Sequence, residues 1–307
     1  MLFWIRKTIH ITACFYVLIF GLLNTAPIYS AKLEQAGQTG FLVVAADRGT
    51  AGNEEIRKAF NAFSASHPAA LVFVTDEHSR QILQSGLSRL NQHNIGRIVV
   101  LPLFISAAEP RYQLIHKLIS EENQTIPVTF TKPYGESDFA IEALATRLRS
   151  IKRTAHQPLL VIGYGAQQDT DRRAMYSDWM RIIKQATQGI HFRSINSLIL
   201  LEEKTEEAPE IRKDKTKRQL SGALASFDPA NRNGKKQVVV FALGPKHDDT
   251  TSLETRLKQL LPANAKLNSF EPESGYLTKW MLQIANDHPP QATELSLNQC
   301  QSHTSTQ

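Results

Sequence analysis

Cysteine is nearly absent from this chain of 307 residues, which contains only Cys14 and Cys300. The first lies in an apolar N-terminal segment and the second in a polar C-terminal stretch, so no internal disulfide is predicted. The sequence also lacks a basic patch laced with aromatic residues, and its formal net charge of +6 is small, so we predict no nucleic-acid partner. The hydrophobic content of 42% is nevertheless enough for a large core.

The apolar run Ile11 to Leu23 is shorter than the roughly 20 residues that a membrane span needs. It follows a basic start and precedes small and turn residues ending at Ala31, which is typical of a secretory signal. We therefore predict an exported protein, periplasmic or extracytoplasmic, with residues 1–31 as its signal. Because Tyr29 stands where a small residue is preferred before the cut, an uncleaved N-terminal membrane anchor is the alternative.

Apolar runs and amphipathic stretches alternate along the rest of the chain. In the first half the pattern predicts strands at 41–45, 71–74, 97–105 and 128–130, and helices at 53–63, 82–90, 111–119 and 138–149. It then restarts, with strands at 158–162, 194–201 and 237–243 and helices at 170–187 and up to 225. Strands that are apolar throughout are typical of parallel sheets covered on both faces.

The predicted fold class is therefore α/β, with two tandem units that each hold a short, mostly parallel sheet flanked by helices. We assign residues 32–155 to the first unit, 156–287 to the second, and 288–307 to a disordered polar tail.

Three segments of the first half follow one another in a specific order: FLVVAADRG at 41–49, NEEI at 53–56 and IVVLPLFISA at 98–107. This order resembles the class II chelatases, the family of sirohydrochlorin cobaltochelatases and ferrochelatases, here in two tandem copies with degenerate motifs. The resemblance implies insertion of a divalent metal ion, cobalt or ferrous iron, into a tetrapyrrole such as sirohydrochlorin. Imidazoles would serve as metal ligand and base, and metal and tetrapyrrole would be substrates.

The first copy departs from the family pattern at both histidines. Ala46 stands in place of the first histidine, and the second falls on Pro110. Beside it, Glu109 is predicted to be a surface turn carboxylate, with a hard-oxygen metal ligand as the alternative. Asp47 and Arg48 follow Ala46, and we predict that they pair with each other, with anion binding at the strand end as the alternative.

The second copy keeps more of the pattern. Tyr164 replaces the first histidine between two glycines that preserve the turn, and His247 falls at the second histidine position. The resemblance thus implies His247 and Tyr164 as catalytic residues, His247 and Asp248 as metal ligands, and Gly163, Gly165 and Gly244 as backbone positions that bind the cofactor or substrate.

Three hypotheses for function remain open. The first is a chelatase with weakened or lost catalysis in its first half, and the second is an exported metal- or tetrapyrrole-binding protein without catalytic activity. The third is an interaction protein that uses the charged run Glu202 to Lys217, which is otherwise predicted to be the solvated start of a helix. The sequence leaves the oligomeric state open.

Overall fold

The computed structural model describes residues 37–75, 78–121, 125–152, 157–202, 208–227, 235–241, 253–268 and 274–290. The first half contains β1 (Gln38–Ala46), α2 (Gly49–Ser64), β2 (Ala69–Val74), α3 (Ser79–Asn91), β3 (Ile95–Leu103), α4 (Pro110–Glu121), β4 (Val128–Phe130), a 3-10 turn η1 (Tyr134–Glu136) and α5 (Asp138–Arg149). The second half contains β5 (Leu159–Ala166), α6 (Asp169–Ala186), β6 (Ile195–Leu201), α7 (Pro209–Phe227), β7 (Lys236–Val240), α8 (Leu253–Leu260), β8 (Ala265–Asn268) and α9 (Ser274–Asp287). Within these ranges no helix combines the length and the apolar character needed to cross a membrane.

The strands form two separate four-stranded sheets with the same topology. The first has the order β2-β1-β3-β4 and the second β6-β5-β7-β8. Every neighbouring pair is parallel. The predicted fold class, two mostly parallel sheets flanked by helices, is thereby confirmed, whereas the exact domain boundaries stay a prediction.

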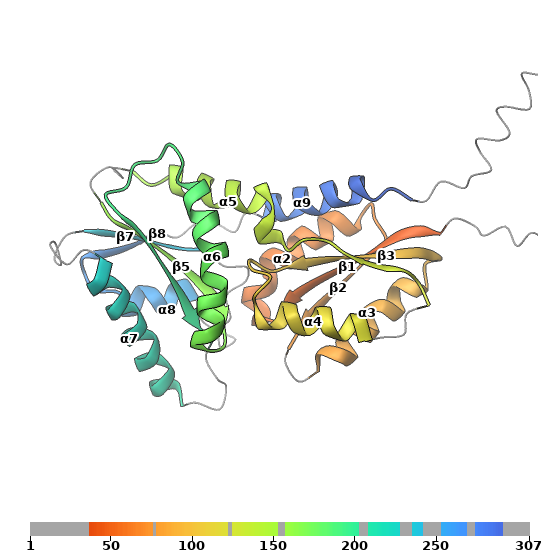
Figure 1. Ribbon diagram of the computed structural model, residues 1–307, viewed down its shortest axis with the longest axis horizontal. Coiled ribbons are helices and arrows are strands. Elements are labelled where there is room, and N and C mark those ends of the chain that lie inside the picture. Colours follow the sequence, from red (N-terminus) through yellow and green to blue (C-terminus); the bar gives the residue numbers. More distant parts are fainter. Residues whose placement is uncertain are drawn as a thin grey trace, which may run out of the picture. The chain divides into compact units, whose positions relative to one another are not determined.

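Alternation along the central strand β1 explains the layers of the first half. Phe41, Val43 and Ala45 belong to one buried cluster with residues of α2 and α5. Leu42 and Val44 point to the other face and pack with residues of α3 and α4. Because successive side chains of a strand face opposite sides, an all-apolar strand needs helices on both. Figure 1 shows the sheet lying between these helices.

The second sheet is covered in the same manner around its central strand β5. Val161 packs with Trp179 of α6 in one cluster. Ile162 packs on the other face with residues of α7 and α8. The predicted helix running to residue 225 is thus present as α7, although it begins only at Pro209.

The last helix, α9, returns to the first half of the chain. Thr278 Oγ1 donates a hydrogen bond to the carbonyl of Ala59 in α2 at 3.4 Å. The hydroxyls of Tyr276 and Thr146, the latter in α5, lie 2.8 Å apart. The ring of Trp280 packs edge-on against Tyr134. These contacts place α9 against α2 and α5, as Figure 1 shows.

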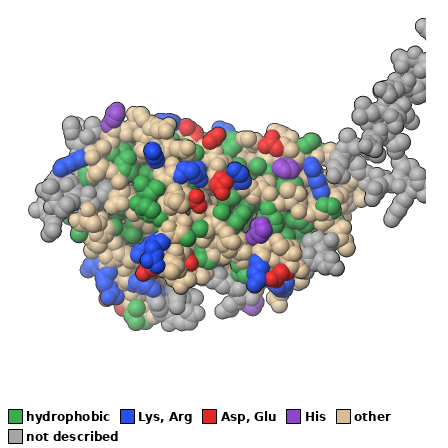
Figure 2. Space-filling view, in the orientation of Figure 1, with side chains coloured by type: hydrophobic (Ala, Val, Ile, Leu, Met, Phe, Trp, Pro, Cys, Tyr) green, Lys and Arg blue, Asp and Glu red, His purple; other side chains and the backbone are tan. Residues whose placement is uncertain are grey.

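Charges of both signs are interspersed on the face of the molecule drawn in Figure 2. Among the described residues, Arg80 forms an exposed pair with Glu121, and Arg149 forms one with Glu142. Pairs of this kind contribute little to stability, since water screens them. The predicted signal and most of the predicted disordered tail lie outside the described residues.

Candidate functional site

The turn after β1 is the segment that corresponds to the first predicted motif. Ala46 ends the strand and is only 5% exposed. Asp47 Oδ1 accepts hydrogen bonds from the backbone nitrogen of Gly49 and from Asn53 Nδ2, both at 2.9 Å. Asn53 Oδ1 in turn accepts from the backbone nitrogen of Arg48 at 2.9 Å. The Asn of the NEEI segment therefore fixes the turn and leaves the Arg48 side chain to point elsewhere.

Four charged side chains meet at the carboxyl ends of the strands, and we call them the charge cluster: Arg48, Glu109, Arg111 and Glu202. Arg48 Nη2 donates to Glu109 Oε1 at 3.1 Å, and its Nη1 donates to Glu202 Oε1. Arg111 Nη1 donates to the same oxygen of Glu202. All four side chains are at most 9% exposed. The cluster joins residues of both halves, because Glu202 directly follows β6.

Burial and neighbouring charges shift the pKa values of the two carboxyl groups in opposite directions. Desolvation raises the pKa of Glu109 to about 7, against the attraction of Arg48, and the negative charge of Glu202 adds to the rise. Burial also opposes ionisation of Glu202, but Arg48 and Arg111 outweigh it and hold the pKa of Glu202 below its ordinary value. Burial disfavours the charged form of Arg48 as well, yet the two carboxylates raise its pKa. Glu202 is thus the permanent anion of the cluster, and Glu109 exchanges a proton near neutral pH.

Three predictions about these residues are wrong. Arg48 pairs with Glu109 and Glu202, whereas Asp47 is held by Gly49 and Asn53. Glu109 is buried at 3% exposure and is no surface carboxylate, and Glu202 is buried where a solvated residue was expected. The reason is tertiary, because the partners of Arg48 lie 61 and 154 positions away in the sequence.

Tyr164, a predicted catalytic residue, lies beside the charge cluster at the end of β5. The Arg48 guanidinium carbon is 5.1 Å from the centre of its ring, a cation–π distance. The residue is 5% exposed and shares a cluster with Leu220 of α7 and Leu257 of α8. In this arrangement the ring packs under the guanidinium.

The two glycines that flank Tyr164 allow close packing. Gly165 has φ +125°, and a Cβ there would lie 3.2 Å from the carboxyl carbon of Glu109. A Cβ on Gly163 would lie 2.6 Å from the indole of Trp179. Both positions therefore exclude a side chain. Their predicted role in binding a ligand stays a prediction.

Little space remains beside the charge cluster. A cavity of about 10 Å³ is lined by Ala46, Arg48, Glu109 and Tyr164, together with residues of β3 and α2. A site needs about 10–15 Å³ to hold one water molecule, so this cavity is at the limit even for a single water.

His247, Asp248 and Gly244 lie outside the described residues, so their predicted roles stay predictions. In the part of the chain that is described, no three His, Cys, Asp or Glu residues are grouped so that they could hold a metal ion. Arg111 and Glu202 were not predicted as site residues. The available signal was a charged residue directly after a buried strand, as with Glu202 after β6, because such ends meet at one edge of a parallel sheet.

Comparison with known proteins agrees with this geometry. Residues 42–151 match the CbiX family model. Sirohydrochlorin chelatase SirB from Bacillus subtilis subspecies spizizenii, in complex with cobalt, has the same fold, with a TM-score of 0.54, 16% identity and coverage of 81% of this chain and 94% of that chain. SirB from Bacillus subtilis with Fe3+ gives a TM-score of 0.54 and 16% identity, covering 81% of this chain and 95% of the other. No curated protein gives a significant sequence match.

The first half of the chain, residues 42–151, is thus similar to the CbiX family, and the chain shares the fold of the chelatase SirB. The predicted resemblance to the class II chelatases is thereby confirmed for residues 42–151, whereas the predicted degeneration of two tandem copies stays a prediction.

Proposed function

We propose that this protein binds a divalent metal ion or a tetrapyrrole through its second half, and that its first half has lost metal insertion. The observation that carries the proposal is the charge cluster, which surrounds the turn of the first half where the histidine would stand. Ala46 stands in the place of an imidazole, and Arg48 pairs with two carboxylates that would otherwise be candidate ligands. A guanidinium stays protonated at physiological pH, so it neither coordinates a metal nor accepts a pyrrole proton.

The lack of space supports the same conclusion. A metal ion on its way to a macrocycle needs an open coordination position. The cavity of about 10 Å³ beside Arg48 and Tyr164 is far smaller than the roughly 300–1,000 Å³ of small-molecule sites. We therefore assign metal handling to the segment that carries His247 and Asp248.

An imidazole and a carboxylate form a mixed nitrogen and oxygen ligand set, which suits a first-row divalent ion. The SirB structures, one with cobalt and one with Fe3+, support a first-row metal ion as the bound ion. Without a cysteine near these residues, binding is expected to be reversible, unlike that at a structural zinc site.

The proposal includes export. The basic start and the apolar run Ile11 to Leu23 support a signal, so binding would take place outside the cytoplasm. N-terminal sequencing of the protein from cell fractions tests this. A start near residue 32 in an extracytoplasmic fraction is expected, and an intact N-terminus in the cytoplasm would contradict it.

Calorimetric titration of the full chain with cobalt(II) tests the metal site. We compare the wild type with His247→Ala and with His93→Ala, a matched control because His93 is an exposed histidine in the turn after α3. Binding is expected for the wild type and for His93→Ala, and its loss for His247→Ala. Equal binding by all three proteins would contradict the assignment of His247.

Turnover is tested separately by supplying sirohydrochlorin with cobalt(II) and recording the absorbance of the tetrapyrrole. Spectral changes that saturate at one equivalent of protein are expected for binding without insertion. Continued product formation that is lost in His247→Ala would show that the second half retains catalysis. If the protein binds neither metal nor tetrapyrrole, the proposal is overturned in favour of an interaction protein.

A further inference from the structure

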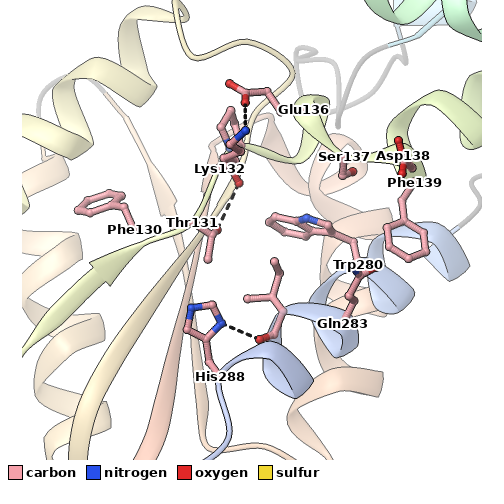
Figure 3. Close-up of a pocket in the computed structure, with 12 residues that line it drawn as sticks. Phe130, Thr131, Lys132, Glu136, Ser137, Asp138, Phe139, Trp280, Gln283 and His288 are labelled. Carbon is pink, nitrogen blue, oxygen red and sulfur yellow. Dashed lines mark hydrogen bonds and ion pairs between the residues drawn. The ribbon is translucent and has the colours of Figure 1, made fainter.

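A second cavity lies away from the charge cluster, between the chain that follows β4 and the helix α9. Its volume is about 400 Å³, within the range of roughly 300–1,000 Å³ that is usual for small-molecule sites. Figure 3 shows Thr131 on one side and Trp280 on the other, with Lys132 and Glu136 at one end and His288 at the opposite end. None of these residues belongs to the site of the proposed function.

Trp280 provides a fixed aromatic wall. Its ring packs edge-on against Tyr134, with centroids 5.6 Å apart and an interplanar angle of 78°. The residue is only 3% exposed, so neighbours hold its orientation. Phe139 and Ile284 extend the apolar lining. A flat, largely apolar body is the shape that such a wall accommodates best.

Acceptor groups outnumber donors among the charged lining residues. Glu136 and Asp138 contribute two carboxylates, whereas Lys132 is the single ammonium. The Lys132 Nζ lies 3.6 Å from Glu136 Oε2, and the lysine side chain is 85% exposed. An exposed pair of this kind is weak because water screens it, so another cation is able to displace Lys132 from Glu136.

His288 adds an acceptor at the opposite end of the cavity. Its Nδ1 lies 2.9 Å from the carbonyl oxygen of Ile284. Because a carbonyl oxygen only accepts, Nδ1 carries the hydrogen, and Nε2 of the neutral ring has a free lone pair. Figure 3 shows this hydrogen bond and the ring of His288 at the lower end of the cavity.

We propose that this cavity binds a small organic cation with a flat aromatic body, that is, a protonated arylalkylamine. The aromatic body lies along the apolar lining that Trp280, Phe139 and Ile284 provide. The ammonium group replaces that of Lys132 beside Glu136. A hydrogen-bond donor at the far edge of the ligand reaches His288.

Equilibrium dialysis of the full chain tests the proposal with two probes of matched shape, 2-naphthylmethylammonium and 2-naphthoate, each measured by its absorbance. The cation is expected to bind more tightly than the anion. Glu136→Gln should weaken cation binding about three- to five-fold, and Lys132→Gln should strengthen it by a similar factor, as expected for one exposed ion pair. All changes are at exposed positions, and circular dichroism verifies that the fold is retained.

Glu142 and Arg149 provide the matched control, since they form an exposed pair at 2.7 Å on α5 and do not line the cavity. Glu142→Gln and Arg149→Gln make the same changes in net charge and are expected to leave binding unchanged. Tighter binding of naphthoate, equal effects of the two sets of variants, or no bound probe at millimolar concentration would each overturn the proposal. Metal binding at His247 is not involved, so the two proposals fail or succeed independently.

Discussion

Replacing Glu109 by glutamine tests the electrostatics of the charge cluster most directly. The folded protein holds the pKa of Glu109 at about 7, above the ordinary 4.5. The protonated form is therefore favoured in the folded state, and the stability it contributes is complete below pH 4.5 and lost as the pH rises through 7. Glutamine keeps the shape of the protonated side chain but does not ionise, so Glu109→Gln removes this dependence.

The size of the effect follows from the shift. Each pKa unit corresponds to about 1.4 kcal/mol, so between pH 5 and pH 8 the free energy of unfolding of the variant should gain about 2–3 kcal/mol relative to the wild type. Urea unfolding at pH 5, 6, 7 and 8 measures it.

Glu142→Gln is the control, because this carboxyl is exposed and Arg149 lowers its pKa, which is the opposite direction to the shift at Glu109. If the free energy of unfolding of Glu109→Gln relative to wild type stays constant or falls from pH 5 to pH 8, the raised pKa of Glu109 is refuted.

Three further substitutions test the packing around the cluster. Arg48→Leu leaves Glu202 and Glu109 without one buried partner and should cost about 3–5 kcal/mol in urea unfolding, and a loss below about 1 kcal/mol would mean that Arg48 is replaceable. Gly165→Ala combines an unfavourable φ with a close contact to Glu109, so it should lower the free energy of unfolding by about 2 kcal/mol or more. Gly189→Ala has a positive φ but open space around it, so it should lower the free energy of unfolding by less. Equal losses in the two variants would show that the contact with Glu109 contributes nothing. Ala46→His places an imidazole beside a cavity of only about 10 Å³, so it should lower the thermal midpoint of unfolding and leave cobalt binding unchanged. A gain in cobalt binding would show that the site of the first half can be restored.

The strand and helix pattern was predictable because both signals are local. Buried parallel strands such as β3 are apolar along most of their length, and helices such as α5 show apolar spacing and a cap, since Ser137 Oγ accepts from the backbone nitrogen of Ala140. Three elements, α8, β8 and α9, were not predicted; α8 and β8 have only eight and four residues, which give too few periods to distinguish a pattern.

The return of α9 to the first half was also beyond the sequence. Its apolar face shows that it packs against something, but the partner depends on the path of the whole chain. Trp280 meets Tyr134 across a separation that no local rule encodes. The cavity near His288 exists only because of this return.

The sequence by itself determined the α/β class, the family resemblance and the replacement of the first histidine by Ala46, because these depend on composition, periodicity and motif order. The tertiary structure decided what surrounds that position. It alone brings Glu202 to Arg48 and buries Glu109, since the carboxyl ends of strands from both sheets meet there. Exposure and pairing of charged residues are properties of the packed chain, and so the charge cluster became visible only in the fold.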